Sequence, residues 1–310
     1  MKVKWKGVYP AITTQFTLDD ALDYSAYENN VKALLEAGVD GLILGGSLGE
    51  ASVLSEEEKF ELLKYTQGLV KGEIPLILNI AEQSTRTAIS IAQQAEALGA
   101  DGLMLLPPMR YKADDRETLT YFKTIAASTS LPIIIYNNPI DYKIHVSLDM
   151  FEELAAIPTI QAVKESTRDV TNVTRMINRF GQRFKILCGV DPLAMESLVM
   201  GADGWVAGLV DAFPRETVAV YRLIKAGKYE EALAIYRWFL PVLELDIHPK
   251  LVQYIKLAAA MTGIGTEPVR APRLLIEGLE RENVLKIIND ALAVRPKLPN
   301  GSWGRVAVSA

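Results

Sequence analysis

Residues 160–166 read Ile-Gln-Ala-Val-Lys-Glu-Ser, an apolar run that predicts a buried strand with Lys164 at its end. Residues 133–139 read Ile-Ile-Ile-Tyr-Asn-Asn-Pro and predict the preceding strand, which ends at Tyr136. Burial favours the neutral form of a lysine, and a neutral lysine amine attacks carbonyl carbons. The alternative is a lysine whose stem follows apolar surface while its ammonium reaches water. If buried, the two side chains bring a nucleophile and a proton-transfer group to one rim.

Short apolar runs of this kind recur about every 30 residues, as strands that alternate with helices do. They cover residues 8–13, 41–44, 76–80, 102–106, 132–136, 160–164, 185–189 and 204–207. The segments between them have helical signals, such as the capping box of Ser55 and Glu58 and the first-turn proline Pro214. The pattern predicts a (β/α)8 TIM barrel over residues 1–226. A doubly wound sheet is the alternative, but residues 13–17 lack the glycines of its first loop.

The pattern becomes wholly helical after the eighth predicted strand and its helix. Helices are predicted over residues 228–244, 249–262 and 281–292. We expect residues 227–295 to form a C-terminal helical appendage that packs on the barrel. Residues 296–310 contain prolines, glycines and small residues and predict an extended tail.

The composition limits the classes of function and the compartment. The chain has 310 residues, of which 49% are hydrophobic and 23% charged, and this predicts a substantial core. A net charge of -5 with both signs interspersed argues against nucleic acid as a partner. Cys188 is the single cysteine, so no intrachain disulfide is possible and a reducing compartment is expected. The absence of a signal-like segment or an apolar run of about 20 residues predicts a cytoplasmic protein that does not enter membranes.

The active site of such a barrel lies at the carboxyl ends of its strands. The second predicted strand leads into Gly45-Gly46-Ser47-Leu48-Gly49-Glu50, whose backbone N–H groups and serine hydroxyl suit a carboxylate. Three of these candidates also have a purely structural interpretation. The loop would then be a tight turn, Tyr136 a core aromatic residue and Asp191 a helix N-cap. A carboxylate cradle, a lysine and a tyrosine together suit a 2-oxo acid, since lysine forms an imine at the keto carbon.

Other chemistries have few residues to support them. His145 and His248 are the two histidines, and their spacing does not fit a metal site. A P-loop is missing from the sequence. We therefore expect neither a metal nor an organic cofactor, with a covalent imine on Lys164 in their place.

Three motifs in this order resemble the dihydrodipicolinate synthase/N-acetylneuraminate lyase family, and the resemblance covers about residues 5–295. The motifs are Gly46-Ser47-Leu48-Gly49-Glu50, Tyr136-Asn137-Asn138-Pro139 and Val163-Lys164-Glu165-Ser166. The resemblance implies a (β/α)8 enzyme in which Lys164 forms a Schiff base and Tyr136 relays protons. It also implies that Gly46, Ser47 and the Leu48 backbone bind the substrate carboxylate, that the Val206 backbone lines the pocket, and that Asp191 contacts substrate hydroxyls. A homotetramer or dimer is implied as the assembly.

Three departures from the family pattern bear on the substrate. Asp141 stands where dihydrodipicolinate synthases carry an arginine for the second substrate's carboxylate, and an aspartate would repel that group. Ser47 and Leu48 replace two threonines, so a threonine-to-tyrosine relay cannot run through Leu48. Arg110 replaces a tyrosine that reaches into a neighbouring subunit, with Tyr111 as a candidate substitute.

These departures favour the catabolic members of the family over a true dihydrodipicolinate synthase. Within the family, residues 107–114 and 205–210 favour a resemblance to the deaminase of hydroxyproline catabolism, which acts on 1-pyrroline-4-hydroxy-2-carboxylate. The expected function is a lyase or deaminase for a hydroxylated 2-oxo acid or its cyclic imine. The alternatives are a pyruvate-dependent aldolase or synthase, including a keto-deoxy sugar acid aldolase or dehydratase, and a barrel that binds a 2-oxo acid without turnover.

Overall fold

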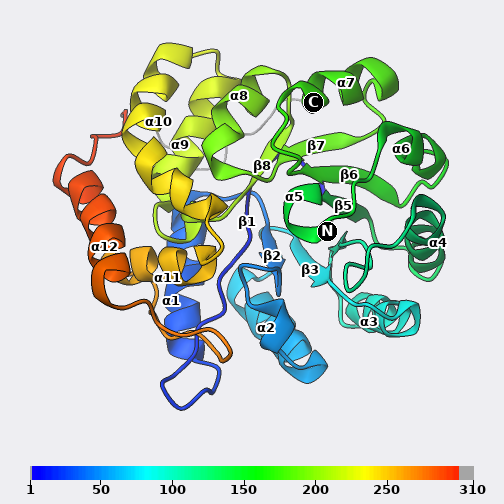
Figure 1. The fold of residues 1–310 in the computed structure, drawn as a ribbon, viewed down its shortest axis with the longest axis horizontal. Helices are drawn as coiled ribbons and strands as arrows, with labels where there is room; N and C mark the ends of the chain where they lie inside the picture. Colours follow the sequence, from blue (N-terminus) through cyan, green and yellow to red (C-terminus); the bar gives the residue numbers. More distant parts are fainter. Residues whose placement is uncertain (1, 300–310) are drawn as a thin grey trace.

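The inner layer of the fold is a barrel of parallel strands, as the sequence predicted (Figure 1). The structure, a computed structural model, describes residues 2–299. Within them, eight strands form one sheet in which β1 pairs with β8, and a bridge from Ala11 to Ile43 joins the remaining edges. The strands are β1 (Gly7–Pro10), β2 (Leu42–Leu44), β3 (Leu76–Ile80), β4 (Gly102–Leu105), β5 (Ile133–Asn137), β6 (Ile160–Glu165), β7 (Lys185–Cys188) and β8 (Gly204–Ala207).

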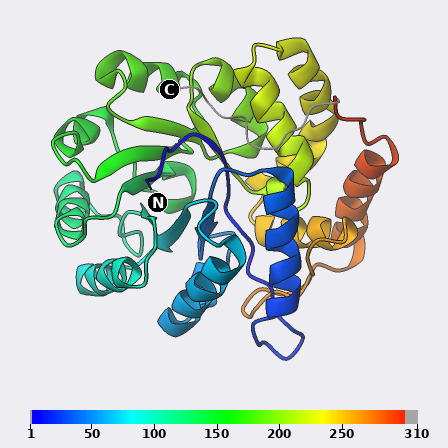
Figure 2. The same ribbon diagram turned by 180° about the vertical axis from the view of Figure 1, so that it is seen from behind.

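Helices form the outer layer and cover the barrel on the side away from its axis (Figures 1 and 2). The predicted capping box of Ser55 and Glu58 begins α2, and Pro214 is the first residue of α9. The α-helices of this layer are α1 (Tyr24–Ala37), α2 (Glu56–Val70), α3 (Thr85–Ala97), α4 (Asp115–Ala126), α6 (Leu148–Leu154), α7 (Thr171–Phe180), α8 (Ala194–Val199) and α9 (Pro214–Lys225). The short helix α5 (Pro139–Tyr142) lies instead over the strand ends, inside the ring of outer helices (Figure 1). Short 3-10 helices occur at η1 (Ala51–Val53), η2 (Asp191–Leu193) and η3 (Leu209–Asp211).

The strands are buried on both faces, which explains their nearly continuous apolar sequences. All residues of β5 are buried, and in β6 only Gln161 is partly accessible. Trp5 donates a hydrogen bond from Nε1 to Gln161 Oε1 at 3.1 Å, so the N-terminal segment crosses the barrel on the face seen in Figure 2. The opposite face, at the carboxyl ends of the strands, remains for a site.

The C-terminal helices predicted from the sequence are present, with ends within a few residues of those expected. They are α10 (Tyr229–Leu243), the 3-10 helix η4 (Glu244–Ile247), α11 (Leu251–Met261) and α12 (Gly278–Ala293). They pack against one side of the barrel, where α10 contacts α9 and α11 contacts η3 (Figure 1). Residue 226, the predicted end of the barrel, lies between α9 and α10. Of the predicted tail, residues 296–299 form neither helix nor strand, and residues 300–310 lie outside the described residues.

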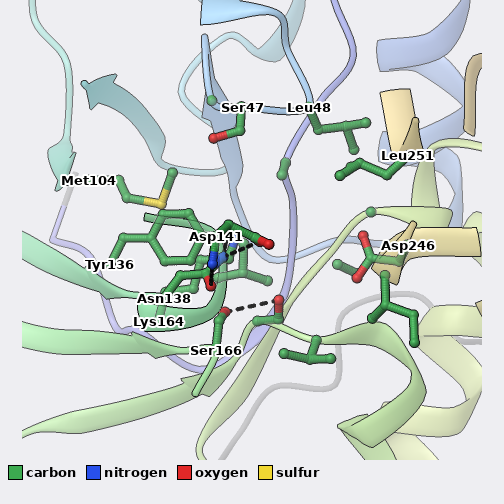
Figure 3. A pocket seen from close by; sticks show the side chains of 18 of the residues that line it. Ser47, Leu48, Met104, Tyr136, Asn138, Asp141, Lys164, Ser166, Asp246 and Leu251 are labelled. Carbon is green, nitrogen blue, oxygen red and sulfur yellow. Dashed lines mark hydrogen bonds between the residues drawn. The ribbon is translucent and has the colours of Figure 1, made fainter. Parts of the chain in front are cut away.

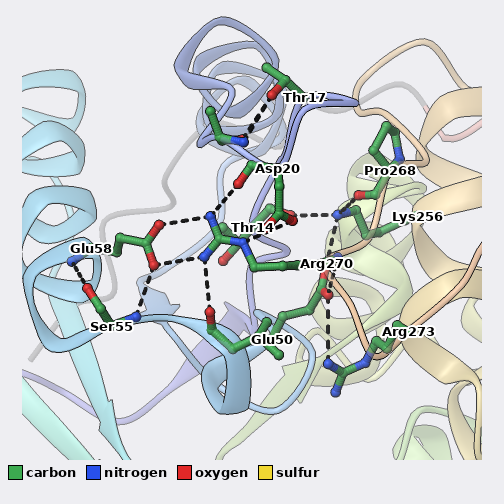
Figure 4. Close-up of polar contacts among 12 residues, drawn as sticks. Thr14, Thr17, Asp20, Glu50, Ser55, Glu58, Lys256, Pro268, Arg270 and Arg273 are labelled. Carbon is green, nitrogen blue, oxygen red and sulfur yellow. Dashed lines mark hydrogen bonds and ion pairs between the residues drawn. The ribbon is translucent and has the colours of Figure 1, made fainter.

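Buried ion pairs join the C-terminal segment to the loop that follows β2 (Figure 4). Lys256 of α11 is fully buried, and its Nζ lies 3.1 Å from Glu50 Oε1 and 2.8 Å from the Thr14 carbonyl. Arg270 forms a two-pronged pair with Glu58 of α2, with both distances at 2.8 Å. The loop after β2 is therefore held from the side by residues far along the chain.

Candidate active site

A pocket opens at the carboxyl ends of the strands, where the barrel architecture predicts an active site (Figure 3). Its walls come from the loops after β2, β5, β6, β7 and β8, together with η4 and the start of α11. The sequence-predicted residues that line it are Gly46, Ser47, Leu48, Tyr136, Asp141, Lys164 and Val206.

Lys164 and Tyr136 occupy paired positions on neighbouring strands. The two residues are in register between β6 and β5, and Lys164 Nζ lies 4.0 Å from the centroid of the Tyr136 ring. Lys164 is only 7% exposed, and burial lowers the pKa of its ammonium although nearby acidic groups oppose the shift. The amine is thereby available in its neutral, nucleophilic form closer to neutral pH than an exposed lysine.

A glycine makes room for the stem of Lys164. A Cβ at Gly189 would lie 2.6 Å from Lys164 Cγ and 2.2 Å from Ser166 Oγ, which is closer than such atoms pack. Gly189 follows β7, and its carbonyl accepts a hydrogen bond from Ser166 Oγ at 3.0 Å. Lys164 therefore reaches the pocket through a space that only a glycine leaves open.

Tyr136 is buried and protonated at neutral pH. Burial raises the pKa of its phenol to about 12, and the hydrogen bond that Asn138 Nδ2 donates to its oxygen at 3.2 Å opposes this shift. A neutral phenol beside an amine nucleophile can donate a proton to an oxygen that departs from the carbon under attack.

Tyr142 is a pocket residue that the sequence analysis missed. It lies at the end of α5, and its ring packs edge-on against Tyr136 with the centroids 5.5 Å apart. Its hydroxyl forms a hydrogen bond with Ser47 Oγ, and burial raises its pKa. A chain of hydroxyl-bearing side chains thus runs from Ser47 through Tyr142 toward Tyr136. The sequence signal was an aromatic residue three positions after Pro139, within the first turn that the proline begins.

The glycine loop after β2 is held by the barrel beneath it. Asn79 Nδ2 donates to the Gly45 carbonyl at 2.9 Å, and Thr14 Oγ1 donates to the Gly49 carbonyl at 2.7 Å. A Cβ at Gly49 would lie 2.8 Å from the Ile12 carbonyl oxygen, so this close approach requires glycine. The loop presents Ser47 and Leu48 at the upper edge of the pocket in Figure 3. The predicted carboxylate contact of Ser47 and Leu48 stays a prediction.

Asp191 lies behind the wall of the pocket. Its carboxylate accepts hydrogen bonds from Trp205 Nε1 at 2.8 Å and from the backbone N–H groups of Gly208 and Leu209. Burial and the nearby Asp246 raise its pKa to about 8. The residue begins η2, but its side chain does not cap that helix. In this arrangement Asp191 fixes the loop after β8, and its predicted contact with substrate stays untested.

Two further charged residues, Asp246 and Arg168, line the pocket and were missed by the sequence analysis. Asp246 of η4 lies across the pocket from Tyr136 and Lys164 (Figure 3). Arg168, in the loop after β6, has its Nη2 3.9 Å from Asp141 Oδ1. Arg168 lies four residues after Lys164, so its place beyond the strand end was the available signal. Asp246 had none, because its position depends on how η4 packs against the barrel.

Arg110 and Tyr111 lie on the loop after β4, outside the pocket that residues 2–299 form. Both are exposed, and the Arg110 backbone N–H donates to Gln83 Oε1 at 2.5 Å. Their predicted role between subunits stays a prediction. His145 and His248 are likewise exposed and lie between elements.

Among residues 2–299 there is neither a metal-binding cluster nor a membrane-spanning helix. Nowhere in that range do three His, Cys, Asp or Glu side chains group closely enough to hold a metal ion. Every helix in that range is too short or too polar to cross a membrane. The expectation that the enzyme uses no metal or organic cofactor stays a prediction.

Comparison with known proteins gives matches over nearly the whole chain. A sequence model of the Dihydrodipicolinate synthetase family matches residues 4–291. The 4-hydroxy-tetrahydrodipicolinate synthase of Moorella thermoacetica is 30% identical, with 92% of this chain and 97% of the relative covered. The enzyme of the same name from Exiguobacterium sibiricum is 32% identical, with 87% and 91% covered.

Solved structures agree with these sequence matches. The 4-hydroxy-tetrahydrodipicolinate synthase of Methylacidiphilum fumariolicum SolV superposes with a TM-score of 0.88 at 30% identity, covering 93% of this chain and 96% of that one. The dihydrodipicolinate synthase of Acinetobacter baumannii, solved in complex with pyruvate, gives a TM-score of 0.87 at 27% identity, covering 93% and 99%.

Proposed function

Because this chain belongs to the dihydrodipicolinate synthetase family, we propose that it is a lyase that forms a Schiff base between Lys164 and a 2-oxo acid or its cyclic imine. The observation that carries the proposal is the buried amine of Lys164 beside the phenol of Tyr136, on strands in register. A relative from Acinetobacter baumannii was solved with pyruvate, a 2-oxo acid, which supports the choice of substrate.

The first steps follow from the positions of the pocket side chains. Ser47 and the Leu48 backbone would hold the substrate carboxylate at the upper edge of the pocket, within reach of the amine below. The neutral Lys164 amine attacks the 2-carbon and gives a tetrahedral adduct, a carbinolamine from a 2-oxo acid or an aminal from the cyclic imine. Tyr136 donates a proton to the departing oxygen or ring nitrogen, and the cationic imine forms. These steps need no cofactor, because Lys164 itself forms the covalent imine with the substrate.

For the substrate, we propose a hydroxylated 2-oxo acid or 1-pyrroline-4-hydroxy-2-carboxylate. Asp141 and Asp246 both line the pocket, and these carboxylates favour hydroxyl or amine groups over a second substrate carboxylate. After imine formation, loss of a C3 proton and the C4 hydroxyl would follow. With the cyclic substrate, hydrolysis then releases ammonia and a 2-oxo acid semialdehyde. A homotetramer or dimer and a cytoplasmic location, which the family resemblance and composition predict, belong to the same proposal.

A second candidate is a synthase that joins pyruvate to an aldehyde carrying its own carboxylate. The relatives from Moorella thermoacetica and Exiguobacterium sibiricum are named 4-hydroxy-tetrahydrodipicolinate synthases. Arg168 supports this candidate, because its guanidinium lines the pocket next to Asp141 and can offset that negative charge. The position of Asp141 alone is thus weaker evidence against a second carboxylate than the sequence suggested.

Borohydride trapping tests the mechanism and ranks the substrates. The protein is incubated with pyruvate, with a keto-deoxy sugar acid or with 1-pyrroline-4-hydroxy-2-carboxylate, then reduced and mapped by mass spectrometry. We expect an adduct on Lys164, and we expect ammonia release from the cyclic imine. Condensation of pyruvate with aspartate semialdehyde, without ammonia release, would establish the synthase instead. An adduct with none of the three would contradict the Schiff-base proposal.

A further inference from the structure

Asp246 lines the pocket, and its carboxyl group takes no part in the imine-forming steps above. It belongs to η4, in the C-terminal segment, and lies across the pocket from Lys164 and Tyr136 (Figure 3). Its Oδ2 accepts the backbone N–H of Asp191 at 3.1 Å, which fixes the orientation of the carboxyl group. A Cβ at Gly208 would lie 2.7 Å from its Oδ1, so the glycine leaves the space that this oxygen needs.

Asp246 and Asp191 form a pair of neighbouring carboxyl groups with different surroundings. Asp191 accepts N–H groups from Trp205, Gly208 and Leu209, and these donors stabilise its anion. Asp246 accepts the backbone N–H of Asp191, which opposes the rise in pKa that its burial causes. Burial and the nearby Asp246 raise the pKa of Asp191 to about 8 in spite of its donors, so a proton shared by the pair resides on Asp191, and Asp246, the member that faces the pocket, carries the negative charge.

The charges around Asp246 change when the imine forms. Lys164 and Arg168 favour its anion, whereas Asp141 disfavours it. Imine formation from a neutral amine consumes a proton and creates a cation at the Lys164 nitrogen. That cation favours the carboxylate form of Asp246, which then faces the substrate carbon chain as a base held in a buried site.

We infer that Asp246 is a second catalytic acid–base group, which takes the C3 proton of the substrate imine and returns it to the departing C4 oxygen. The inference rests on the proposed function, since it requires the imine on Lys164. Tyr136 then transfers protons during imine formation, and Asp246 transfers the proton of the substrate carbon chain.

The elimination step balances without an oxidant or a further proton donor. The Asp246 carboxylate removes the C3 proton, and the C–H electron pair forms the C2–C3 double bond of an enamine as the imine electrons move to nitrogen. The nitrogen lone pair then restores the imine, the C3–C4 double bond forms, and the C4–O bond breaks. The oxygen takes the proton from Asp246 and leaves as water, and the carboxylate is regenerated.

Pyruvate tests the first half of this cycle without any assumption about the natural substrate. Its methyl hydrogens are the C3 hydrogens, and enamine formation exchanges them for deuterium in D2O, which proton NMR follows. Lys164 adduct formation is measured in parallel by borohydride trapping. The variants are Asp246→Asn, Asp246→Glu and the control Glu244→Gln, an exposed carboxylate in the same 3-10 helix.

We expect Asp246→Asn to keep pyruvate trapping and to slow methyl exchange by about 100-fold or more, the size of effect typical for loss of a general base. Asp246→Glu should restore part of the exchange, and Glu244→Gln should match the unaltered protein. Exchange at the normal rate in Asp246→Asn would overturn this inference alone. Loss of trapping in both Asp246 variants, with native circular dichroism, would also overturn it, because Asp246 would then only position Lys164. No adduct in the unaltered protein would overturn the proposed function and this inference with it.

Discussion

At the scale of single residues, Lys164 is placed where its chemistry conflicts with stability. Its ammonium has a lowered pKa in the folded state because the residue is buried. Between that lowered pKa and the ordinary value, the unfolded chain binds one more proton than the folded one, so stability rises as pH rises. At pH 7 the buried lysine is therefore a source of instability.

The substitution Lys164→Met tests this conflict. We expect it to abolish trapping of pyruvate and to stabilise the fold at pH 7 by about 0.5–2 kcal/mol, the range usual for relief of such strain. Urea unfolding at pH 7 and pH 9 measures the effect, and the gain should shrink at the higher pH. A variant less stable than the unaltered protein at pH 7 would show that the amine is favourably paired.

The position of Lys164 also depends on a single glycine. Because a Cβ at Gly189 would collide with Lys164 Cγ and Ser166 Oγ, Gly189→Ala should displace the amine from its place beside Tyr136. We expect the rate of pyruvate trapping to fall by about 10- to 100-fold, because small misplacements of reacting groups slow their reaction. Gly68→Ala is the matched control, since the new methyl group of this residue in α2 meets nothing within 4 Å. It should leave trapping unchanged, and equal rates in both variants would contradict the steric argument.

At the scale of elements, the barrel strands could be predicted because each is an apolar run buried on both faces. The paired positions of Lys164 and Tyr136 followed from the same pattern, since neighbouring parallel strands end at one rim. Tyr142 lies at the end of the one-turn helix α5 and Arg168 in a loop, and such short segments have no periodicity that shows where their side chains point. Asp246 could not be predicted as a pocket residue, because η4 meets the pocket only through the packing of the C-terminal segment.

The bridge between α11 and the glycine loop gives a prediction at this scale. Lys256→Met removes the nearer of two cations from Glu50, which is fully buried and keeps the longer pair with Arg273 Nη1 at 3.7 Å (Figure 4). We expect a loss of about 3–5 kcal/mol in the free energy of unfolding, the usual cost of breaking one side of a buried pair. Pyruvate trapping should also weaken, because Glu50 ends the loop that carries Ser47.

Two further variants test this prediction. Lys256→Met combined with Glu50→Gln should recover part of the lost stability, since the buried charge is gone. Lys286→Met removes an ammonium that is 74% exposed and pairs with Asp290 on the surface of α12, and it should change stability by less than about 1 kcal/mol. Equal losses from Lys256→Met and Lys286→Met in urea unfolding would show that the buried bridge contributes no more than a surface pair.

At the scale of the whole molecule, the barrel and the C-terminal helices share a packed apolar interface, although the sequence divides them near residue 226. Phe213, next to α9, packs against Phe239 and Trp238 of α10 with ring centroids 5.3 Å and 5.9 Å apart. Asp246 and Leu251, from the same C-terminal segment, complete the wall of the pocket. The repeat pattern showed which residues form strands and helices, but it did not show which surfaces of the barrel need the later helices.

Truncation after residue 226 is therefore expected to prevent folding of the barrel. The shortened chain would expose the apolar surface under α10 and leave Glu50 without Lys256 in a loop that the site requires. We expect it to bind the dye ANS, to lose near-ultraviolet circular dichroism and to trap no pyruvate, which are signs of lost tertiary packing. Truncation after residue 299 is the control, and it should keep native spectra and trapping. A barrel of residues 1–226 that unfolds cooperatively would show instead that the C-terminal helices are an independent addition whose contribution is confined to the pocket wall.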